Sequence, residues 1–263
     1  MFLNTRIKSH QHILNEEAFK LFSSNEHSFR VSEVQSDSFT LSIESLKNED
    51  EEKFLARAHS IIEYYLVAIN IATLGHFSWD FYMVSPVPYF KSEKSGVFEN
   101  FIFLHKKSGY KADEELLEIN TDLVWRSLKV MLALGNERDD VFISEYIKGI
   151  FNLHNSFFNI NFLNESFANF YKAFEYFCTT MILKVKRLNN EKKQLKSVLT
   201  KFGFKTEIVD DFDKIYVVRC NEIMHAQKGI TEGVSTDIIL RLKIFLDALL
   251  HKHYEPIWKQ VNR

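Results

Sequence analysis

The sequence predicts a mostly helical protein in two parts, an α+β domain over residues 1–108 and an all-helical bundle over residues 109–263. In the first part apolar and polar residues alternate in short stretches, which is typical of half-buried strands. From Lys111 onward no strong strand pattern follows, and no proline appears until Pro256. A chain of 263 residues is long enough for two such domains.

Short strands are predicted in the first domain, in a mostly antiparallel sheet. The first carries Phe29–Val31, the second has alternating apolar residues over 39–43, and residues 35–38 form the turn between them. Two further strands are predicted over 79–84 and 97–104.

One long helix is predicted from about Asp50 to Leu74. Its apolar residues recur at spacings of three and four: Phe54, Leu55, Ala58, Ile61, Ile62, Tyr65, Leu66 and Ile69. The acidic residues at 50–52 suit the positive end of the helix dipole, and Gly75 suits its stop. The aromatic-rich strands near Trp79 to Phe103 could form a ligand groove, and they could equally form a sheet that packs on this helix.

The second domain is predicted to hold six helices. They cover about Ala112–Leu134, Asp140–Leu153, Asn164–Arg187, Glu191–Phe202, Asp210–Met224 and Ser235–His253. Asn164 can cap the third helix, which has a broad apolar face rich in phenylalanine, and Gly203 can end the fourth. Helices of this length joined by short connections predict a bundle.

The composition narrows the classes of function. The formal net charge is −2, so the chain has no overall basic surface for binding nucleic acid. Any contact with RNA would have to be made by a local group of basic residues. Two cysteines are too few for a disulfide framework, and the first residues lack the apolar core of a signal peptide. We therefore expect a cytoplasmic protein without a membrane span.

The most informative segment runs from Tyr216 to His225, near the end of a predicted helix. It brings an arginine, an amide, a carboxylate and an imidazole into an otherwise apolar stretch. Arg219 is a permanent cation with a planar fork of donors that suits phosphate. His225 has an unperturbed pKa of about 6.5, which allows proton transfer in both directions near neutrality. Such a pair fits phosphodiester cleavage without a metal.

The same segment resembles the HEPN superfamily (higher eukaryotes and prokaryotes nucleotide-binding domains). The stretch Arg219–His225 fits the superfamily's pattern of an arginine, four to six residues and a histidine. The lead-in Ile215–Arg219 and the aromatic stretch Phe170–Phe177, which contains Glu175, are similar to the Apea-like branch. The resemblance covers a core of about residues 155–253.

This resemblance implies a function as well as a fold. HEPN bundles commonly dimerise and bring two Arg/His motifs into one cleft, and many are metal-independent RNases of phage-defence or toxin–antitoxin systems. The chain is thus expected to be a homodimeric endoribonuclease with an antitoxin or defence-system partner protein, its N-terminal domain acting as a sensor or binding the partner. The alternative is a catalytically inactive HEPN dimer that acts as a scaffold, a nucleotide-binding protein or a regulatory subunit.

The expected chemistry assigns a role to each motif residue. His225 is the general base or acid, Arg219 binds the phosphate, and Asn221 orients the phosphate or the imidazole. Three further side chains are candidate supports: Glu175, Tyr216 and Glu222.

A basic cluster follows the third predicted helix of the bundle. Its members are Lys184, Lys186, Arg187, Lys192 and Lys193. They are the best candidates for binding the RNA backbone, and they equally suit a solvated face.

Helix geometry bears on how these residues meet. In an α-helix Asn221 and His225 share a face because they lie four apart. Arg219 would lie about 120° around the helix from His225 and roughly 9 Å along it. A histidine from a second subunit would solve this mismatch, which favours a two-fold homodimer.

Simpler roles remain open for several of these residues. Arg219 could pair with Glu222 in a surface salt bridge, and His225 could sit at the negative end of a helix dipole. Glu175 could be structural. Cys220 could have a lowered pKa beside the arginine, although a small buried residue is the simpler interpretation.

Two histidine pairs look like fragments of a metal site, His10 with His12 and His251 with His253. Residues two apart on a helix point in different directions, and no Cys, His or Asp cluster completes a coordination set. We therefore expect no metal ligands and no cofactor.

Overall fold

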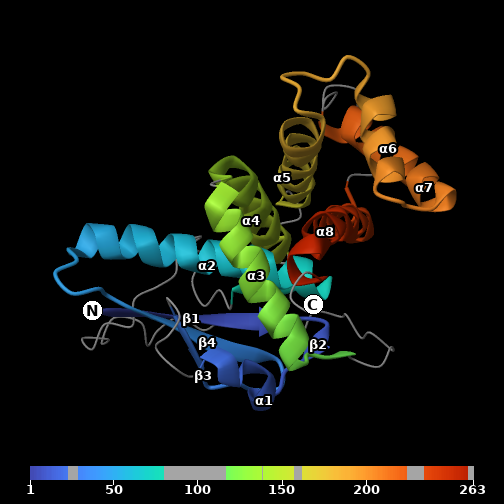
Figure 1. The fold of residues 1–263 in the computed structure, drawn as a ribbon. Helices are drawn as coiled ribbons and strands as arrows, with labels where there is room; N and C mark the ends of the chain where they lie inside the picture. The colour runs from blue at the N-terminus through green and yellow to red at the C-terminus, as the bar shows by residue number, and fades with distance from the viewer. Residues whose placement is uncertain (23–28, 80–116, 138, 157–161, 224–233, 260–263) are drawn as a thin grey trace. The chain divides into compact units, whose positions relative to one another are not determined.

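The computed structural model describes residues 1–22, 29–79, 117–137, 139–156, 162–223 and 234–259. These residues are mostly helical, and they include a small antiparallel sheet (Figure 1). The chain divides into two compact units, Met1–Leu132 and Ala133–Arg263. The expected boundary at 108/109 and the strand expected over 97–104 lie outside the described residues.

The first unit contains a four-stranded sheet with the order β3-β4-β1-β5. The strands are β1 (Phe2–Ser9), β3 (Arg30–Ser32), β4 (Ser38–Glu44) and β5 (Phe77–Trp79). Each neighbouring pair is antiparallel, with Thr5 of β1 opposite Leu41 of β4. The strands predicted near 29–31 and over 39–43 are confirmed, whereas β5 starts earlier than the strand predicted over 79–84.

Strand β1 was missed in the sequence because its inward face is half polar. Leu3 and Ile7 are buried on that face together with Thr5 and Ser9. Two hydroxyl residues break the apolar alternation that would mark the strand. Three other short elements were missed as well: β2 (His12–Ile13), α1 (Glu16–Phe19) and a 3₁₀ turn (Lys20–Phe22).

The long helix α2 (Glu51–Thr73) is confirmed. The Asp50 side chain caps its first turn by accepting a backbone N–H at 2.9 Å. The left-handed residue that ends it is Leu74, with φ 53°, and not the glycine that follows. Gly75 is needed for packing instead, because a Cβ there would lie 2.6 Å from the His12 ring.

Helix α2 packs on the sheet through Tyr65, which is fully buried. The ring of Tyr65 lies 4.8 Å from that of Phe29, 5.7 Å from Phe22 and 6.3 Å from Phe39. Large aromatic contacts of this kind supply much of the apolar burial of a small core. They hold α2 against β4 through Phe39 and against Phe22 and Phe29, which lie just outside the strands.

Helix α3 (Thr121–Glu137) begins later than the predicted start at Ala112. The Asn120 side chain accepts the Leu123 N–H at 2.9 Å and so caps the helix at that point. Just before it, β6 (Leu117–Glu118) pairs in parallel with β2, which the sequence did not predict.

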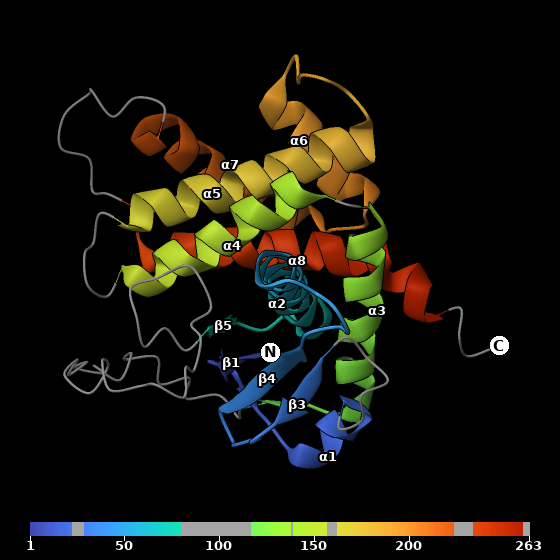
Figure 2. The same cartoon turned by 90° about the vertical axis from the view of Figure 1, so that its left-hand side faces the viewer.

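The second unit, within its described residues, is built from helices. They are α4 (Asp140–Asn155), α5 (Phe162–Tyr176), α6 (Glu191–Lys201), α7 (Thr206–Val218) and α8 (Thr236–Lys259), together with the π-helical turns η2 (Phe177–Leu183) and η3 (Arg219–Ile223). Helices α4 and α5 lie side by side (Figures 1 and 2). They approach closely at Gly149, whose carbonyl accepts the Ser166 hydroxyl at 2.8 Å and where a Cβ would lie 2.8 Å from the Phe170 ring.

Several predicted helix ends are corrected by the structure. Helix α5 begins at Phe162, so Asn164 lies inside it and is not its cap. Its continuation ends before Lys184, which adopts φ 54°, so the predicted end at Arg187 was wrong. Helix α7 begins at Thr206, earlier than predicted, while Gly203 with φ 74° does follow the end of α6.

The last helix runs through Pro256 to Lys259, beyond the end that the sequence predicted. Tyr254 and Trp258 are buried along it. The Tyr254 hydroxyl also donates to Glu137 at 2.6 Å. This anchoring offsets the hydrogen bond that a proline removes. No helix within the described ranges is both long enough and apolar enough to cross a lipid bilayer.

A buried ionic triad lies in the core of the second unit. The Lys243 ammonium lies 2.6 Å from Asp247, and these two side chains are only 3 and 2 % exposed. The hydroxyl of Tyr146, on α4, donates to the other oxygen of Asp247. Burial lowers the pKa of Lys243 and raises that of Asp247, while each partner opposes the shift of the other. The members of the triad therefore stabilise one another's buried charges, because burying either charge without its partner would cost free energy.

We expect Asp247→Ala to destabilise the protein by about 3–5 kcal/mol, because it leaves the Lys243 ammonium buried without its carboxylate. Denaturant unfolding would measure the change. The matched control is Asp237→Ala, which breaks an exposed pair with Arg241 at the same spacing on the same helix. That control should cost less than about 1 kcal/mol. Equal losses in the two variants would contradict this account of the triad.

Candidate functional site

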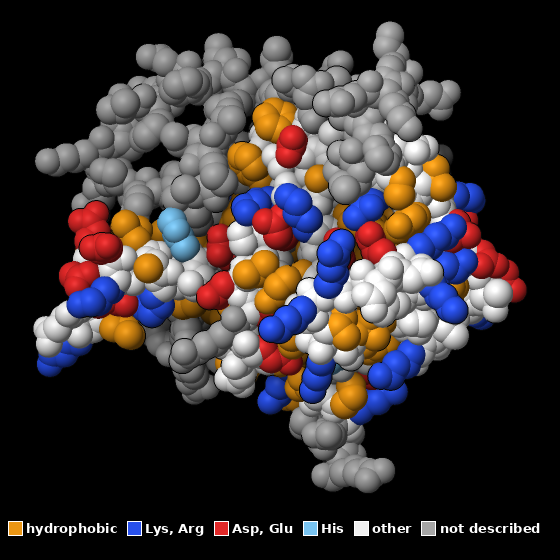
Figure 3. All heavy atoms as spheres, turned by 90° about the horizontal axis from the view of Figure 1, so that it is seen from above, with side chains coloured by type: hydrophobic (Ala, Val, Ile, Leu, Met, Phe, Trp, Pro, Cys, Tyr) orange, Lys and Arg blue, Asp and Glu red, His pale blue; other side chains and the backbone are white. Residues whose placement is uncertain are grey.

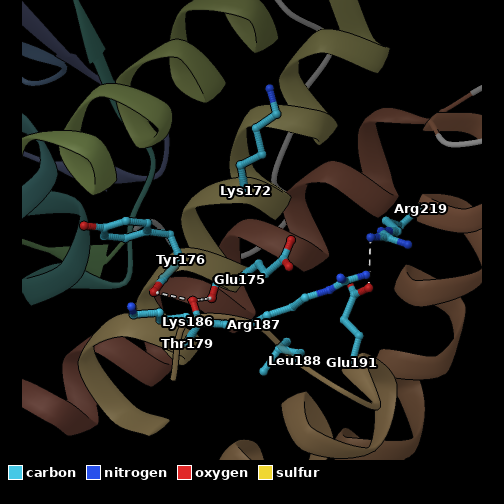
Figure 4. A pocket seen from close by; sticks show the side chains of 9 residues that line it. All are labelled: Lys172, Glu175, Tyr176, Thr179, Lys186, Arg187, Leu188, Glu191 and Arg219. Atoms are coloured by element: carbon cyan, nitrogen blue, oxygen red, sulfur yellow. Dashed lines mark hydrogen bonds and ion pairs between the residues drawn. The ribbon is translucent and has the colours of Figure 1, made fainter. Parts of the chain in front are cut away.

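A pocket of about 450 Å³ opens in the second unit (Figure 4). Its walls come from α5, the two π-helical turns, the loop before α6 and the first residue of α6. It is lined by Lys172, Glu175, Tyr176, Thr179, Lys186, Arg187, Leu188, Glu191 and Arg219. Four cationic side chains and two carboxylates thus face one cavity, which gives it the charge to bind an anion.

Arg219, the arginine singled out in the sequence, is held firmly at this pocket. Its Nη2 lies 2.9 Å from the Oε2 atom of Glu191, and its side chain is 19 % exposed. The centre of its guanidinium lies 5.6 Å from the ring of Tyr171 and 5.8 Å from that of Tyr216. A cation over two aromatic rings and beside a carboxylate has little freedom to turn.

Glu191 is the residue that holds this arginine. It is the first residue of α6, after the Asn190 cap, where the helix dipole favours a carboxylate. One of its oxygens meets Arg219 and the other accepts the hydroxyl of Tyr171 at 2.7 Å. Burial, with Glu191 as acceptor, raises the pKa of Tyr171, so its hydroxyl stays protonated and keeps donating.

Glu175 lies on the same pocket wall, one turn along α5 from Tyr171. Its side chain is half-buried. Burial raises its pKa, the nearby carboxylate of Glu191 raises it further, and the Arg219 guanidinium opposes both effects. Glu175 therefore keeps its proton to higher pH than an exposed glutamate.

Both π-helical turns contribute to the pocket, η2 through Thr179 and η3 through Arg219. In η2 the Thr179 hydroxyl donates to the backbone carbonyls of Glu175 and Tyr176 at 2.8 and 3.1 Å. Such side-chain bonds compete with the α-helical ladder and loosen the turn. Short π-helical turns occur frequently at functional sites.

The chain forms a π-helical turn over Arg219–Ile223, where the sequence predicted the continuation of a regular α-helix. The shared face of Asn221 and His225, and the offset of Arg219 from His225, were both derived for an α-helix. A π-helix bonds residue i to residue i+5 and has a wider turn, so α-helical angles do not apply over Arg219–Ile223. His225 lies outside the described residues, so its position relative to Arg219 and Asn221 stays a prediction.

The structure brings together some of the predicted site residues. Arg219 and Glu175 line the pocket, and Tyr216 contacts the guanidinium. Asn221 is on η3 and is not among the lining residues. Cys220 is half-buried beside them.

His225 lies outside the described residues, as does the side chain of Glu222. The roles predicted for these two residues remain predictions. The carboxylate that pairs with Arg219 in the structure is that of Glu191, on a different helix.

The predicted basic cluster is split by the fold. Lys186 and Arg187 are exposed and line the pocket, and in Figure 4 the Arg187 side chain extends toward the Arg219–Glu191 pair. Lys192 turns to α7 instead, where it lies 3.2 Å from Asp213. The other two members, Lys184 and Lys193, do not line the pocket. Basic and acidic side chains are interspersed on the face shown in Figure 3, as the small net charge implies.

Five of the residues that line the pocket were not predicted as site residues: Lys172, Tyr176, Thr179, Leu188 and Glu191. Tyr171, which contacts Glu191 beside the pocket, was not predicted either. Tyr171 belongs to the aromatic stretch Phe170–Phe177, in which only Glu175 was given a possible role. Asn190 followed by Glu191 is a readable helix start, but the sequence holds no signal that this carboxylate meets Arg219, which comes 28 positions later.

The histidine pairs that resembled metal fragments have other surroundings. His10 shares a hydrogen bond of 2.8 Å with Ser78. His251 packs against Trp258 and His253 against Phe177. Within the described part of the chain, no group of three or more His, Cys, Asp or Glu residues could hold a metal ion.

Comparison of the chain with protein-family models, with curated proteins and with solved structures gives no match. The candidate site therefore rests on its geometry and on the sequence motif.

The raised pKa of Glu175 predicts a specific pH dependence. A raised folded-state pKa contributes stability that is complete below the ordinary value of 4.5 and is lost as pH rises through the raised value. The stability of the wild type relative to Glu175→Gln should therefore fall between about pH 4 and pH 7. Denaturant unfolding at both pH values measures this difference. The matched variant is Glu165→Gln, which changes an exposed carboxylate on the same helix. A constant difference between wild type and Glu175→Gln would contradict the assignment.

Proposed function

We propose that this protein is an endoribonuclease of the HEPN type that cleaves RNA without a metal, through attack by the 2′-hydroxyl. One observation carries the proposal. The arginine of the Arg/His motif is fixed by Glu191 at the wall of a pocket that holds three further cations, Lys172, Lys186 and Arg187. This arrangement suits a phosphodiester. The resemblance of the motif to HEPN RNases supports the same reaction.

RNA supplies its own nucleophile in this reaction. The 2′-hydroxyl attacks the adjacent phosphorus, a base takes its proton, and an acid protonates the departing 5′-oxygen. The products carry a 2′,3′-cyclic phosphate and a 5′-hydroxyl. Negative charge develops on the non-bridging oxygens in the transition state, and a fixed cation stabilises it most effectively.

Arg219 fits the role of this fixed cation. Its guanidinium is held before substrate arrives, so it needs little rearrangement as charge develops on the phosphate. Its planar fork of N–H donors matches two phosphate oxygens. We assign the proton transfers to His225, with Asn221 orienting the phosphate or the imidazole.

The proposal includes a two-fold homodimer. Two copies would place two Arg/His motifs in one cleft, as the resemblance to HEPN bundles implies. A role as effector in phage defence or in a toxin–antitoxin system follows from the same resemblance, with the first unit as sensor or partner-binding part.

One observation favours a second candidate function, binding without cleavage. Arg219 is already neutralised by Glu191, and such an ion pair also suits a structural role in an inactive HEPN dimer. An inactive dimer would bind a nucleotide or RNA, or assemble a complex, and leave the phosphodiester intact.

The first test compares wild type, His225→Ala and Arg219→Ala on total RNA and tRNA with EDTA present. We expect cleavage by the wild type that leaves cyclic-phosphate ends. Each variant should lose at least about 100-fold in rate, the lower end of what one acid–base group or one donor that stabilises transition-state charge contributes. Mass spectrometry of the product ends identifies the reaction.

The control for this test is His154→Ala, which changes a histidine on α4 that does not line the pocket. It should cleave like the wild type. Folding of all variants is checked by thermal unfolding. If the folded wild type binds RNA but leaves it intact, the binding function replaces the nuclease.

A second test concerns RNA binding by Lys186 and Arg187. The double variant Lys186→Ala/Arg187→Ala should bind an uncleavable 2′-deoxy oligonucleotide more weakly than the wild type. The slope of log affinity against log salt should become shallower by about 0.7 for each phosphate that the variant no longer binds. Fluorescence anisotropy at several salt concentrations measures both the affinity and the slope.

The matched control is Lys201→Ala/Lys214→Ala, which removes two exposed charges outside the pocket. It should leave the slope unchanged. Identical slopes for the two double variants would show that Lys186 and Arg187 do not bind RNA phosphates.

A further inference from the structure

Glu191 lies outside the Arg/His motif, but its carboxylate forms an ion pair with the arginine of that motif. Its Oε2 lies 2.9 Å from Arg219 Nη2, and its Oε1 accepts the buried Tyr171 hydroxyl at 2.7 Å. The Glu191 side chain is 16 % exposed. The carboxylate is therefore fixed by α5 on one side and holds the arginine on the other.

The contacts around Arg219 hold its guanidinium in one orientation as well as balancing its charge. The guanidinium is oriented by the Glu191 carboxylate and by the rings of Tyr171 and Tyr216. An arginine has several rotatable bonds, and a free one would lose this freedom only when substrate binds. The ion pair with Glu191 uses the Nη2 atom of Arg219, and the Cys220 thiol also interacts with the guanidinium. A guanidinium carries more N–H donors than these contacts need, so donors remain for a phosphate.

We infer that Glu191 is a positioning residue that orients the guanidinium of Arg219 toward the scissile phosphate, with Tyr171 holding the Glu191 carboxylate in place. This inference rests on the proposed nuclease function. Glu191 acts through Arg219 and does not itself touch the reacting atoms.

This role has two opposite electrostatic consequences. The negative charge of Glu191 opposes the approach of an RNA phosphate to the pocket. Its hold on Arg219 favours the transition state. Removing the charge should therefore lower kcat while KM stays the same or falls. A purely structural glutamate would not separate the two constants in this way.

The experiment measures cleavage of an RNA oligonucleotide by the full chain carrying Glu191→Gln. We expect kcat to fall about 10- to 100-fold, the loss that a small misplacement of a catalytic group causes, with KM unchanged or lower. Tyr171→Phe keeps the carboxylate and should give a smaller loss in the same direction. It also tests the inference if Glu191→Gln does not fold, as judged by thermal unfolding.

A double-mutant cycle shows whether Glu191 acts through Arg219. In single-turnover reactions, Glu191→Gln should have little further effect once Arg219 is alanine, because the group that it positions is gone. The control Asp211→Asn removes the carboxylate of another ion pair on α7 that does not line the pocket, and it should change neither constant.

Each other outcome has a definite meaning. A wild type that cleaves, with an unchanged kcat in Glu191→Gln, overturns this inference and leaves the nuclease intact. Additive losses in the cycle overturn it as well, because Glu191 would then act independently of Arg219. A wild type that does not cleave overturns the nuclease proposal, and the inference with it.

Discussion

The ion pair between Arg219 and Glu191 joins parts of the second unit that are distant in the sequence. Arg219 stands on the π-helical turn after α7, Glu191 begins α6, and Tyr171 of α5 holds the second carboxylate oxygen. Desolvating such charges is costly, and the cost is offset only when each group has a well-placed partner. The pocket exists where these three segments meet.

The second unit contains another ionic group of a different kind. Lys243 and Asp247 pair within the core, and Tyr146 completes their contacts away from solvent. The Arg219–Glu191 pair is partly exposed and borders a cavity. An ion pair that is buried in the core can only stabilise the fold, whereas an ion pair that borders a cavity can also bind a ligand. This difference in exposure is the physical reason for assigning the candidate site to Arg219 and not to Lys243.

Much of the fold could be predicted from local patterns, and most of the site could not. Helix α2 has a regular apolar repeat and an acidic first turn, so its extent could be read with little error. Strand β1 carries Thr5 and Ser9 on its buried face, which hides its alternation. Arg219 is marked by its motif. Its partner Glu191 is not part of any motif. The pairing of Glu191 with Arg219 depends on how the helices pack, so it leaves no periodic pattern in the sequence.

The π-helical turns are a further limit on prediction. The α-helical angles used for the motif assume a regular turn, and the chain departs from one at Arg219. The Thr179 hydroxyl bonds in η2 show how side-chain donors can loosen a helix without any proline or glycine. Both departures occur at the pocket.

The most direct test of the account is a structure of the full chain bound to an oligonucleotide whose scissile position carries a 2′-deoxy sugar, so that it cannot be cleaved. The account predicts that the phosphate at that position lies within hydrogen-bond distance of the Arg219 guanidinium and of a His225 imidazole, from the same subunit or its partner. A phosphate bound away from both side chains would contradict it.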